Sequence, residues 1–141
     1  MPPMPYALDN DVFFAALYEG HVAHIDARGW LDANKSMGWA IAMETYLAAM
    51  RLLMNPTILG RGILDGALAR RAVETELAGA HPGRVLFSGE RPKGEMFDRA
   101  TGHRQVMDFW LIQTARAHGH TLVTRDKALS RAWPDDSMLL P

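Results

Sequence analysis

Residues 6–18 read YALDNDVFFAALY: a short apolar run, a polar junction and a second apolar run. The first run has the length of a strand, and the apolar residues from Val12 to Tyr18 recur at helical spacing until Gly20 interrupts them. The junction between the two runs carries Asp9 and Asp11. This order predicts a strand, a polar turn and a helix.

The same alternation continues along the chain. Three further strands are predicted, at 38–42, 84–87 and 120–124. Four further helices are predicted, over 21–35, 43–54, 62–78 and 101–118, and a loop over 88–101. Strands that alternate with helices pair in parallel through right-handed crossovers. We therefore expect an α/β fold with a parallel sheet, and the length of 141 residues predicts a single domain over 1–141.

Helical spacing also predicts which side chains face the core. In the helix over 21–35 the inward residues would be Val22, Ile25, Trp30 and Leu31. In the helix over 43–54 they would be Met43, Leu47, Met50 and Met54. The first helix differs, because Phe13, Phe14 and Tyr18 crowd more than one of its faces. This crowding predicts that a second chain covers part of that helix.

The composition excludes several classes of protein. The chain has no cysteine, which excludes disulfide frameworks, thiolate zinc sites, iron–sulfur clusters and cysteine nucleophiles. No apolar stretch approaches the about 20 residues that span a bilayer, and the first residues lack a signal pattern. We expect a soluble, cytoplasmic protein with no membrane contact. A net charge of -1 argues against broad binding of nucleic acid, so any such contact must be local.

Three aspartates fall at equivalent places in this pattern. Asp9 and Asp126 each follow a predicted strand, and Asp108 lies in the second turn of the helix over 101–118. Functional crevices of parallel sheets lie at the carboxyl ends of the strands, so the three carboxylates should converge there. Clustered carboxylates hold Mg²⁺ or Mn²⁺, which can activate water to hydrolyse a phosphodiester. Each acid also has a structural interpretation: Asp9 and Asp126 as helix caps, Asp108 as a partner of Arg104.

Several motifs, in order along nearly the whole chain, resemble PIN-domain ribonucleases of the VapC toxin family. They are LDNDV at 8–12, GWA at 38–40, Thr45 with Arg51 and NP at 55–56, GHRQVMD at 102–108 and TRD at 124–126. The resemblance implies a three-layer α/β/α sandwich with a central parallel sheet. It also implies a Mg²⁺-dependent endoribonuclease, the toxin of a type II toxin–antitoxin module, with RNA as substrate. A cognate antitoxin that blocks the site and a homodimer are the partners implied.

The resemblance assigns roles to individual residues. Asp9 matches the first acid of the family, Asp108 the third and Asp126 the fourth, all as metal carboxylates. Thr124 matches a hydroxyl two residues before the last acid, where it could orient a neighbouring group or water. Arg51 would reach a phosphate at the rim, although a solvated helix arginine is nearly as common.

The second acid of the family is missing, because alignment places it at Tyr46. Glu44 is close in sequence, but two helical steps turn a side chain by about 200°. Glu44 can therefore substitute only if the helix has not begun there. Asp11 stands where the family usually has asparagine and could return the lost charge. Both remain candidates, and with three matched acids we expect Mg²⁺ to bind more weakly than with four.

Two other functions compete with the nuclease. The strand followed by Asp9 and Asp11 also resembles haloacid-dehalogenase-type phosphatases, with Asp9 as nucleophile and Asp11 as acid and base. Asp135 and Asp136 would supply a weak later motif, but 102–108 would stay unexplained. The third function is a degenerate PIN fold that binds RNA or protein without cutting, and Tyr46 is its main support.

Overall fold

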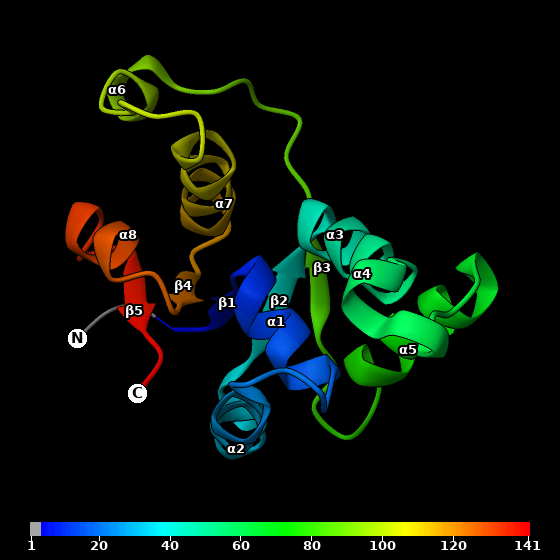
Figure 1. Ribbon diagram of the computed structural model, residues 1–141. Coiled ribbons are helices and arrows are strands. Elements are labelled where there is room, and N and C mark those ends of the chain that lie inside the picture. Colours follow the sequence, from blue (N-terminus) through cyan, green and yellow to red (C-terminus); the bar gives the residue numbers. More distant parts are fainter. Residues whose placement is uncertain (1–3) are drawn as a thin grey trace.

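The computed structural model describes residues 4–141, and within them five short strands form one parallel sheet (Figure 1). The strands are β1 (Tyr6–Leu8), β2 (Trp39–Ala42), β3 (Arg84–Leu86), β4 (Thr121–Thr124) and β5 (Ser137–Leu139). Their order across the sheet is β3-β2-β1-β4-β5, and every neighbouring pair is parallel. The predicted parallel α/β fold is therefore confirmed. The chain builds outward from β1 to β3 and then returns to the other side of β1, so the strand order reverses between β1 and β4.

The helices of the described chain are mostly short. They are α1 (Asn10–Leu17), α2 (His24–Asn34), α3 (Met43–Leu53), α4 (Pro56–Leu59), α5 (Gly66–Leu77), α6 (Gly94–Phe97), α7 (Gln105–Ala117) and α8 (Lys127–Ala132). Two 3₁₀ turns, Lys35–Met37 and Gly60–Gly62, follow α2 and α4. Over residues 4–141, none of these helices has the length and apolar content needed to cross a membrane.

The sheet divides the core into two apolar clusters. Successive side chains of a strand point to opposite faces. Leu8, Ile41 and Val123 accordingly pack with residues of α1, α2, α3 and α5. Their neighbours Ala7 and Leu122 pack on the other face with residues of α6, α7 and α8. The molecule is thus a three-layer α/β/α sandwich, as the resemblance implies (Figure 1).

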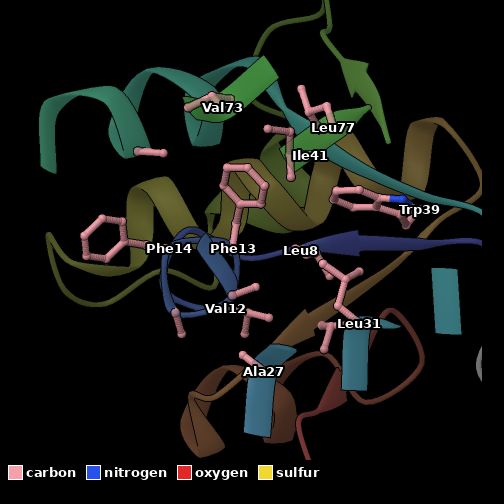
Figure 2. Close-up of a cluster of buried hydrophobic side chains, with 14 of the residues drawn as sticks. Leu8, Val12, Phe13, Phe14, Ala27, Leu31, Trp39, Ile41, Val73 and Leu77 are labelled. Carbon is pink, nitrogen blue, oxygen red and sulfur yellow. The ribbon is translucent and has the colours of Figure 1, made fainter. Parts of the chain in front are cut away.

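The aromatic side chains of α1 are buried within this chain. Phe13 is 0% exposed, lies near Ile41 and has its ring centroid 6.4 Å from that of Trp39 (Figure 2). Phe14 is 5% exposed and stacks on Tyr18 at 5.3 Å. The crowding of aromatic residues on this helix is therefore explained within the chain, and a second chain is not needed to cover it. The helix packs against the sheet and against α2, α3 and α5, so more than one of its faces is inside.

The predicted inward faces of two helices were only partly right: Leu31 is buried and Trp30 packs on the core as predicted, but Val22 and Ile25 do not. In α2 the buried residues are Ala27 and Leu31. Ile25 is 84% exposed, and Val22, which lies just before the helix, is 93% exposed. In α3 the buried residues are Thr45, Ala49 and Leu53. Of the four residues predicted to face inward there, Met43, Leu47 and Met54 are exposed and only Met50 packs on the core. Small residues let a helix approach its neighbours closely, and one alanine lies in each contact, Ala27 in α2 and Ala49 in α3, beside the buried Leu31 and Leu53.

Several element boundaries differ from prediction. The helix predicted from 101 begins at Gln105, whose side-chain carbonyl accepts hydrogen bonds from the backbone N–H groups of Thr101 and Gly102. Those bonds hold the preceding residues in a turn, and Asp108 therefore lies in the first helical turn rather than the second. The segment predicted as a loop contains α6, and β5 was missed altogether. Both elements are too short for periodicity to detect.

Candidate functional site

Strand register brings Asp9 beside Thr124. Leu8 pairs with Val123, so the residues that follow them stand side by side at the carboxyl edge of the sheet. The backbone N–H of Asp9 donates to the carbonyl of Val123 at 2.9 Å. The Thr124 hydroxyl is fully buried and donates to Asp9 Oδ2 at 2.7 Å. Thr124 thus orients the Asp9 carboxylate, in agreement with the predicted role of that hydroxyl.

The third residue of this corner is Asp126. Its backbone N–H donates to the Thr124 hydroxyl oxygen at 3.1 Å, which links the two strand ends. Asp126 Oδ1 accepts from the N–H groups of Ala128 and Leu129 and caps α8. Asp9 caps α1 in the same way, because its Oδ1 accepts from the N–H of Asn10 at 2.7 Å. The structural interpretation is correct for both acids, and capping holds each carboxylate at the edge.

The three predicted aspartates line one cavity. It has a volume of about 420 Å³ and is bordered by Asp9, Asn10, Asp11, Asp108, Arg125 and Asp126. Asp108 enters it from the first turn of α7, and no ion pair joins it to Arg104 within residues 4–141. The site lies beside the reversal of strand order, where open α/β sheets commonly bind ligands.

The carboxylates in this cavity repel one another. Burial, followed by the charges of Asp9 and Asp126, raises the pKa of Asp108 from 3.8 to about 6. Burial is also the main cause that raises the pKa of Asp9, against the opposing hydrogen bonds from Thr124 and Asn10. The cavity therefore concentrates negative charge, and the ionised form of Asp108 is disfavoured there.

The oxygen donors at the cavity fit a hard divalent cation. Carboxylate oxygens are the ligands that Mg²⁺ and Mn²⁺ prefer, and a cation would relieve the repulsion that raises the pKa of Asp108. Among residues 4–141, no three or more His, Asp or Glu side chains form a group arranged to hold a metal ion. The carboxylates are therefore not a ready-made cage. Mg²⁺ commonly keeps several waters and uses one or two carboxylates, so the site suits a hydrated ion.

Of the two candidates for the missing acid, Asp11 lines the acidic cavity and Glu44 lines a different one. The condition for Glu44 is not met, because α3 begins at Met43 and Glu44 is already helical. Asp11 is exposed, forms an ion pair with Arg125 at 2.6 Å and accepts a hydrogen bond from His21 Nε2 at 2.9 Å, since His21 Nδ1 accepts from the N–H of Ala23. Its charge is thus partly compensated by this chain.

Tyr46 does not stand in for the missing acid. Its hydroxyl donates to Glu74 Oε2 at 2.8 Å, and its ring packs on the core shared by α1, α3 and α5. Position 46 has therefore become part of the contact between α3 and α5. Of the two candidates for the missing acid, only Asp11 lines the acidic cavity, and it comes from another element, α1.

Sequence reasoning assigned no role to Asn10, which lines two cavities. Its Oδ1 accepts a hydrogen bond of 2.5 Å from the buried hydroxyl of Thr45, which ties α1 to α3. Beside the acidic cavity, Asn10 also lines a cavity of about 280 Å³ together with Arg51. Arg51 is exposed and is separate from the acids. The position of Asn10 between two acids was the available signal.

The second motif of the phosphatase interpretation lies at the wrong end of the sheet. Asp136 immediately precedes β5, and its carbonyl accepts from the N–H of Leu122 in β4. Because the strands are parallel, Asp136 is at the amino edge, opposite the edge where Asp9 follows β1. Its carboxylate pairs with Arg116 at 2.7 Å. It cannot assist Asp9 from there.

Comparisons with known proteins find relatives that match most of the chain. The sequence profile of the PIN domain matches residues 6–133. Among similar proteins of Mycobacterium tuberculosis, ribonuclease VapC38 is 31% identical over 119 residues, 84% of this chain and 83% of its own length. Ribonuclease VapC29 is 32% identical over 142 residues, 98% of each chain. Ribonuclease VapC39 is 32% identical over 134 residues, 90% of this chain and 92% of its own.

A solved structure with a similar fold is VapBC2 from Rickettsia felis, bound to a DNA fragment from their promoter. The superposition has a TM-score of 0.65 and covers 98% of this chain and 100% of the matched chain. The sequences are 14% identical, so this likeness concerns the fold alone.

Proposed function

This chain belongs to the PIN-domain family, among the VapC ribonucleases, and from that premise we propose that it is a metal-dependent endoribonuclease of a type II toxin–antitoxin module. One observation carries the proposal. Asp9, Asp108 and Asp126, which match family acids, come from three separate segments and line one cavity at the carboxyl edge of the sheet. The proposed reaction is hydrolysis of an RNA phosphodiester bond in the cytoplasm by metal-activated water.

The proposed cofactor is Mg²⁺, or Mn²⁺ in its place, held by Asp9, Asp108 and Asp126. When bound, the ion supplies activation of water and compensation of the charge that develops at the phosphate. Asp9 is fixed for this task by Thr124 and by the N–H of Asn10. Asp11 adds a fourth carboxylate at the rim, where its ion pair with Arg125 reduces the charge it contributes.

Cations beside the acids would hold the RNA backbone. Arg125 lines the acidic cavity, and Arg51 lines the adjoining cavity that shares Asn10. Phosphates that follow these two arginines would pass directly over the acids. Contacts of this kind position a backbone without reading bases. They also agree with a chain of net charge -1, since only a local path is positive.

The proposed protein partners are a cognate antitoxin and a second copy of the chain. Large apolar side chains on and between α3, α4 and α5 are exposed by 41–54%: Leu47, Met54, Ile58, Ile63 and Leu68. Exposed apolar residues that gather on neighbouring elements mark protein interaction surfaces. They differ from the residues that α3 and α5 bury, which include Ala49, Leu53, Ala69 and Val73.

The proposal is tested by incubating the purified protein with structured RNAs in the presence of Mg²⁺ or Mn²⁺. We expect cleavage that EDTA abolishes and that Asp9→Ala lacks. Calorimetric titration of each metal into the wild type and Asp108→Asn tests the site independently of RNA. Weaker binding by the variant supports the metal assignment, and equal binding by both proteins contradicts it.

A preparation that binds RNA but cuts none of the RNAs with either metal would favour the degenerate binding module. The control for that outcome is circular dichroism, which shows whether the protein is folded. Cleavage that survives EDTA would remove the metal from the proposal but keep the nuclease.

A further inference from the structure

An apolar cavity lies next to the acids and has no role in the proposed hydrolysis. It has a volume of about 390 Å³ and is lined by Glu44, Pro92, Phe97, Val106, Met107 and Trp110. The volume is within the range of small-ligand pockets, about 300–1,000 Å³. Val106 and Met107 are exposed by 53% and 45%, so the walls are open to solvent.

The two cavities are joined through consecutive residues. Met107 faces the apolar cavity and Asp108 the acidic one, both from the first turns of α7. Glu44 faces the apolar cavity, whereas the next residue, Thr45, holds Asn10 in the wall of the acidic cavity. A ligand bound in the apolar cavity therefore lies next to a phosphate held at the acids.

Glu44 supplies the one carboxylate in these apolar walls. Its Oε1 has no accessible surface and no hydrogen-bond partner within the described residues 4–141. A buried acceptor without a partner is costly, so a turn of the Glu44 side chain that brings Oε1 to the cavity is favoured when a ligand there supplies a donor. Residence in the first turn of a helix is favourable for the charge, but it leaves the hydrogen bond of Oε1 unmade.

We infer that this cavity binds one unpaired guanine base of the RNA, next to the scissile phosphate, with Glu44 accepting hydrogen bonds from its Watson–Crick edge. The inference rests on the proposed nuclease function. Unpaired bases are recognised by stacking on aromatic side chains and by hydrogen bonds to their free edges. Trp110 and Phe97 offer the aromatic surface.

Guanine is the base whose edge matches a carboxylate. Its N1–H and N2–H donors are adjacent and parallel, which suits the two oxygens of Glu44 as a charge-assisted pair. Adenine and cytosine each place a ring acceptor beside their amino group, and uracil flanks its N3–H with two carbonyls. Those acceptors would face the carboxylate and be repelled. Glu44 is therefore a specificity-determining residue. It lines the apolar cavity and not the acidic one, so this role is separate from metal binding.

The test begins with a pool of synthetic single-stranded RNAs that carry randomised bases. Sequencing of the products of the wild-type protein with Mg²⁺ should show guanine enriched at one position beside the cut. Replacing that guanine by inosine, which lacks the N2 amino group, should lower kcat/KM about 10-fold or more, because one hydrogen bond to a charged acceptor is lost. This replacement leaves the protein unchanged, so folding cannot explain the result.

Glu44→Gln should reduce the ratio of kcat/KM for guanine over inosine to less than about 3-fold, because the amide cannot accept both bonds. The matched control is Glu19→Gln, which makes the same charge change at an exposed position beyond the other end of α1 and should keep the wild-type ratio. The inference is overturned if no base is enriched or if Glu44→Gln keeps the full ratio. It is also overturned if Trp110→Ala cuts RNA at the wild-type rate but no longer binds the proposed antitoxin.

Failure of the nuclease itself is recognised separately. If the wild-type protein cuts nothing in the pool, guanosine and inosine 5′-monophosphates are titrated while tryptophan fluorescence is recorded, with Trp110→Phe as the control. Tighter binding of the guanosine nucleotide that Glu44→Gln removes supports the base site. Equal binding of the two nucleotides, or binding of neither, overturns it.

Discussion

Asp9 and Asp108 line the same cavity, but the chain holds them in different ways. Asp9 ends a strand, is buried, and accepts hydrogen bonds from Thr124 and the N–H of Asn10. Asp108 comes from a helix, is half-buried, and accepts no hydrogen bond within the described chain, so burial and neighbouring charges raise its pKa to about 6. The strand side of the site is thus a fixed frame. On the helix side, the carboxylate of Asp108 is stabilised only when a cation binds it or when it takes up a proton.

The largest expected effect does not distinguish the two acids. Asp9→Asn and Asp108→Asn should each lower kcat/KM for RNA cleavage about 1,000-fold or more, because each removes a charge that holds the metal. The measurement is the initial rate with saturating Mg²⁺. Retention of more than a tenth of the activity by either variant would remove that acid from the metal site.

Thr124→Val tests the frame on the strand side. The valine leaves Asp9 Oδ2 without its donor and the N–H of Asp126 without its acceptor. We expect activity to fall about 10- to 100-fold and the free energy of unfolding to fall by about 1–3 kcal/mol, because buried polar groups lose their partners. Urea denaturation and cleavage rates measure the two effects. Serine at this position keeps the hydroxyl and should restore most of both.

Replacing each acid by asparagine should change the free energy of unfolding in opposite directions. Without metal at pH 7.5, Asp108→Asn should raise the free energy of unfolding by about 1 kcal/mol. The full shift in its pKa corresponds to about 3 kcal/mol, which solvent screening reduces for a half-exposed group. Asp9→Asn removes a charge whose pKa burial also raises, but its amide cannot accept both hydrogen bonds that Asp9 accepts; we expect the lost hydrogen bond to outweigh the relief and stability to fall by about 1 kcal/mol. Thermal unfolding in EDTA checks both, and the same sign for both variants would contradict the comparison.

The pH dependence follows from the raised pKa of Asp108. Between its ordinary value of 3.8 and about 6, the folded protein holds a proton that the unfolded chain releases. Stability from this group is therefore greatest below about pH 4 and declines as the pH rises to about 6. The difference in unfolding free energy between the wild type and Asp108→Asn should change across that window by about 1 kcal/mol, with the same solvent screening. A difference in unfolding free energy that stays constant from pH 4 to 7.5 would show that folding does not raise the pKa of Asp108.

The smallest expected effect is at Asp11, whose charge is already compensated by Arg125 and whose Oδ1 accepts a hydrogen bond from His21. Asp11→Asn should change the cleavage rate less than about 5-fold, because asparagine keeps a neutral oxygen donor at the rim. A haloacid-dehalogenase-type phosphatase would lose its acid and base by this change. Loss of nearly all activity would therefore count against the nuclease, and assays with an RNA and with a small phosphate ester separate the two.

The parts of the site that lie on strand ends could be predicted from local sequence. Asp9 and Asp126 follow short apolar runs, and parallel strands place all such residues at one edge. The site of Asp108 could be anticipated because GHRQVMD is specific, although the helix begins four residues later than predicted. Glu44 and Asp11 could not be ranked, because the choice depended on where α3 begins and on which cavity each side chain enters.

The amino-acid sequence alone determined the alternation of strands and helices, the parallel sheet and the three converging aspartates. These features depend on short-range pattern: apolar runs, turn residues and the acids that directly follow them. Only the tertiary structure decided that α2 and α3 turn alanines inward, that Tyr46 joins the contact between α3 and α5, and that Glu44 faces an apolar cavity. Periodicity defines how often a stripe recurs along a helix. Which stripe is buried depends on how closely neighbouring elements approach, and residues far apart in the chain set that approach.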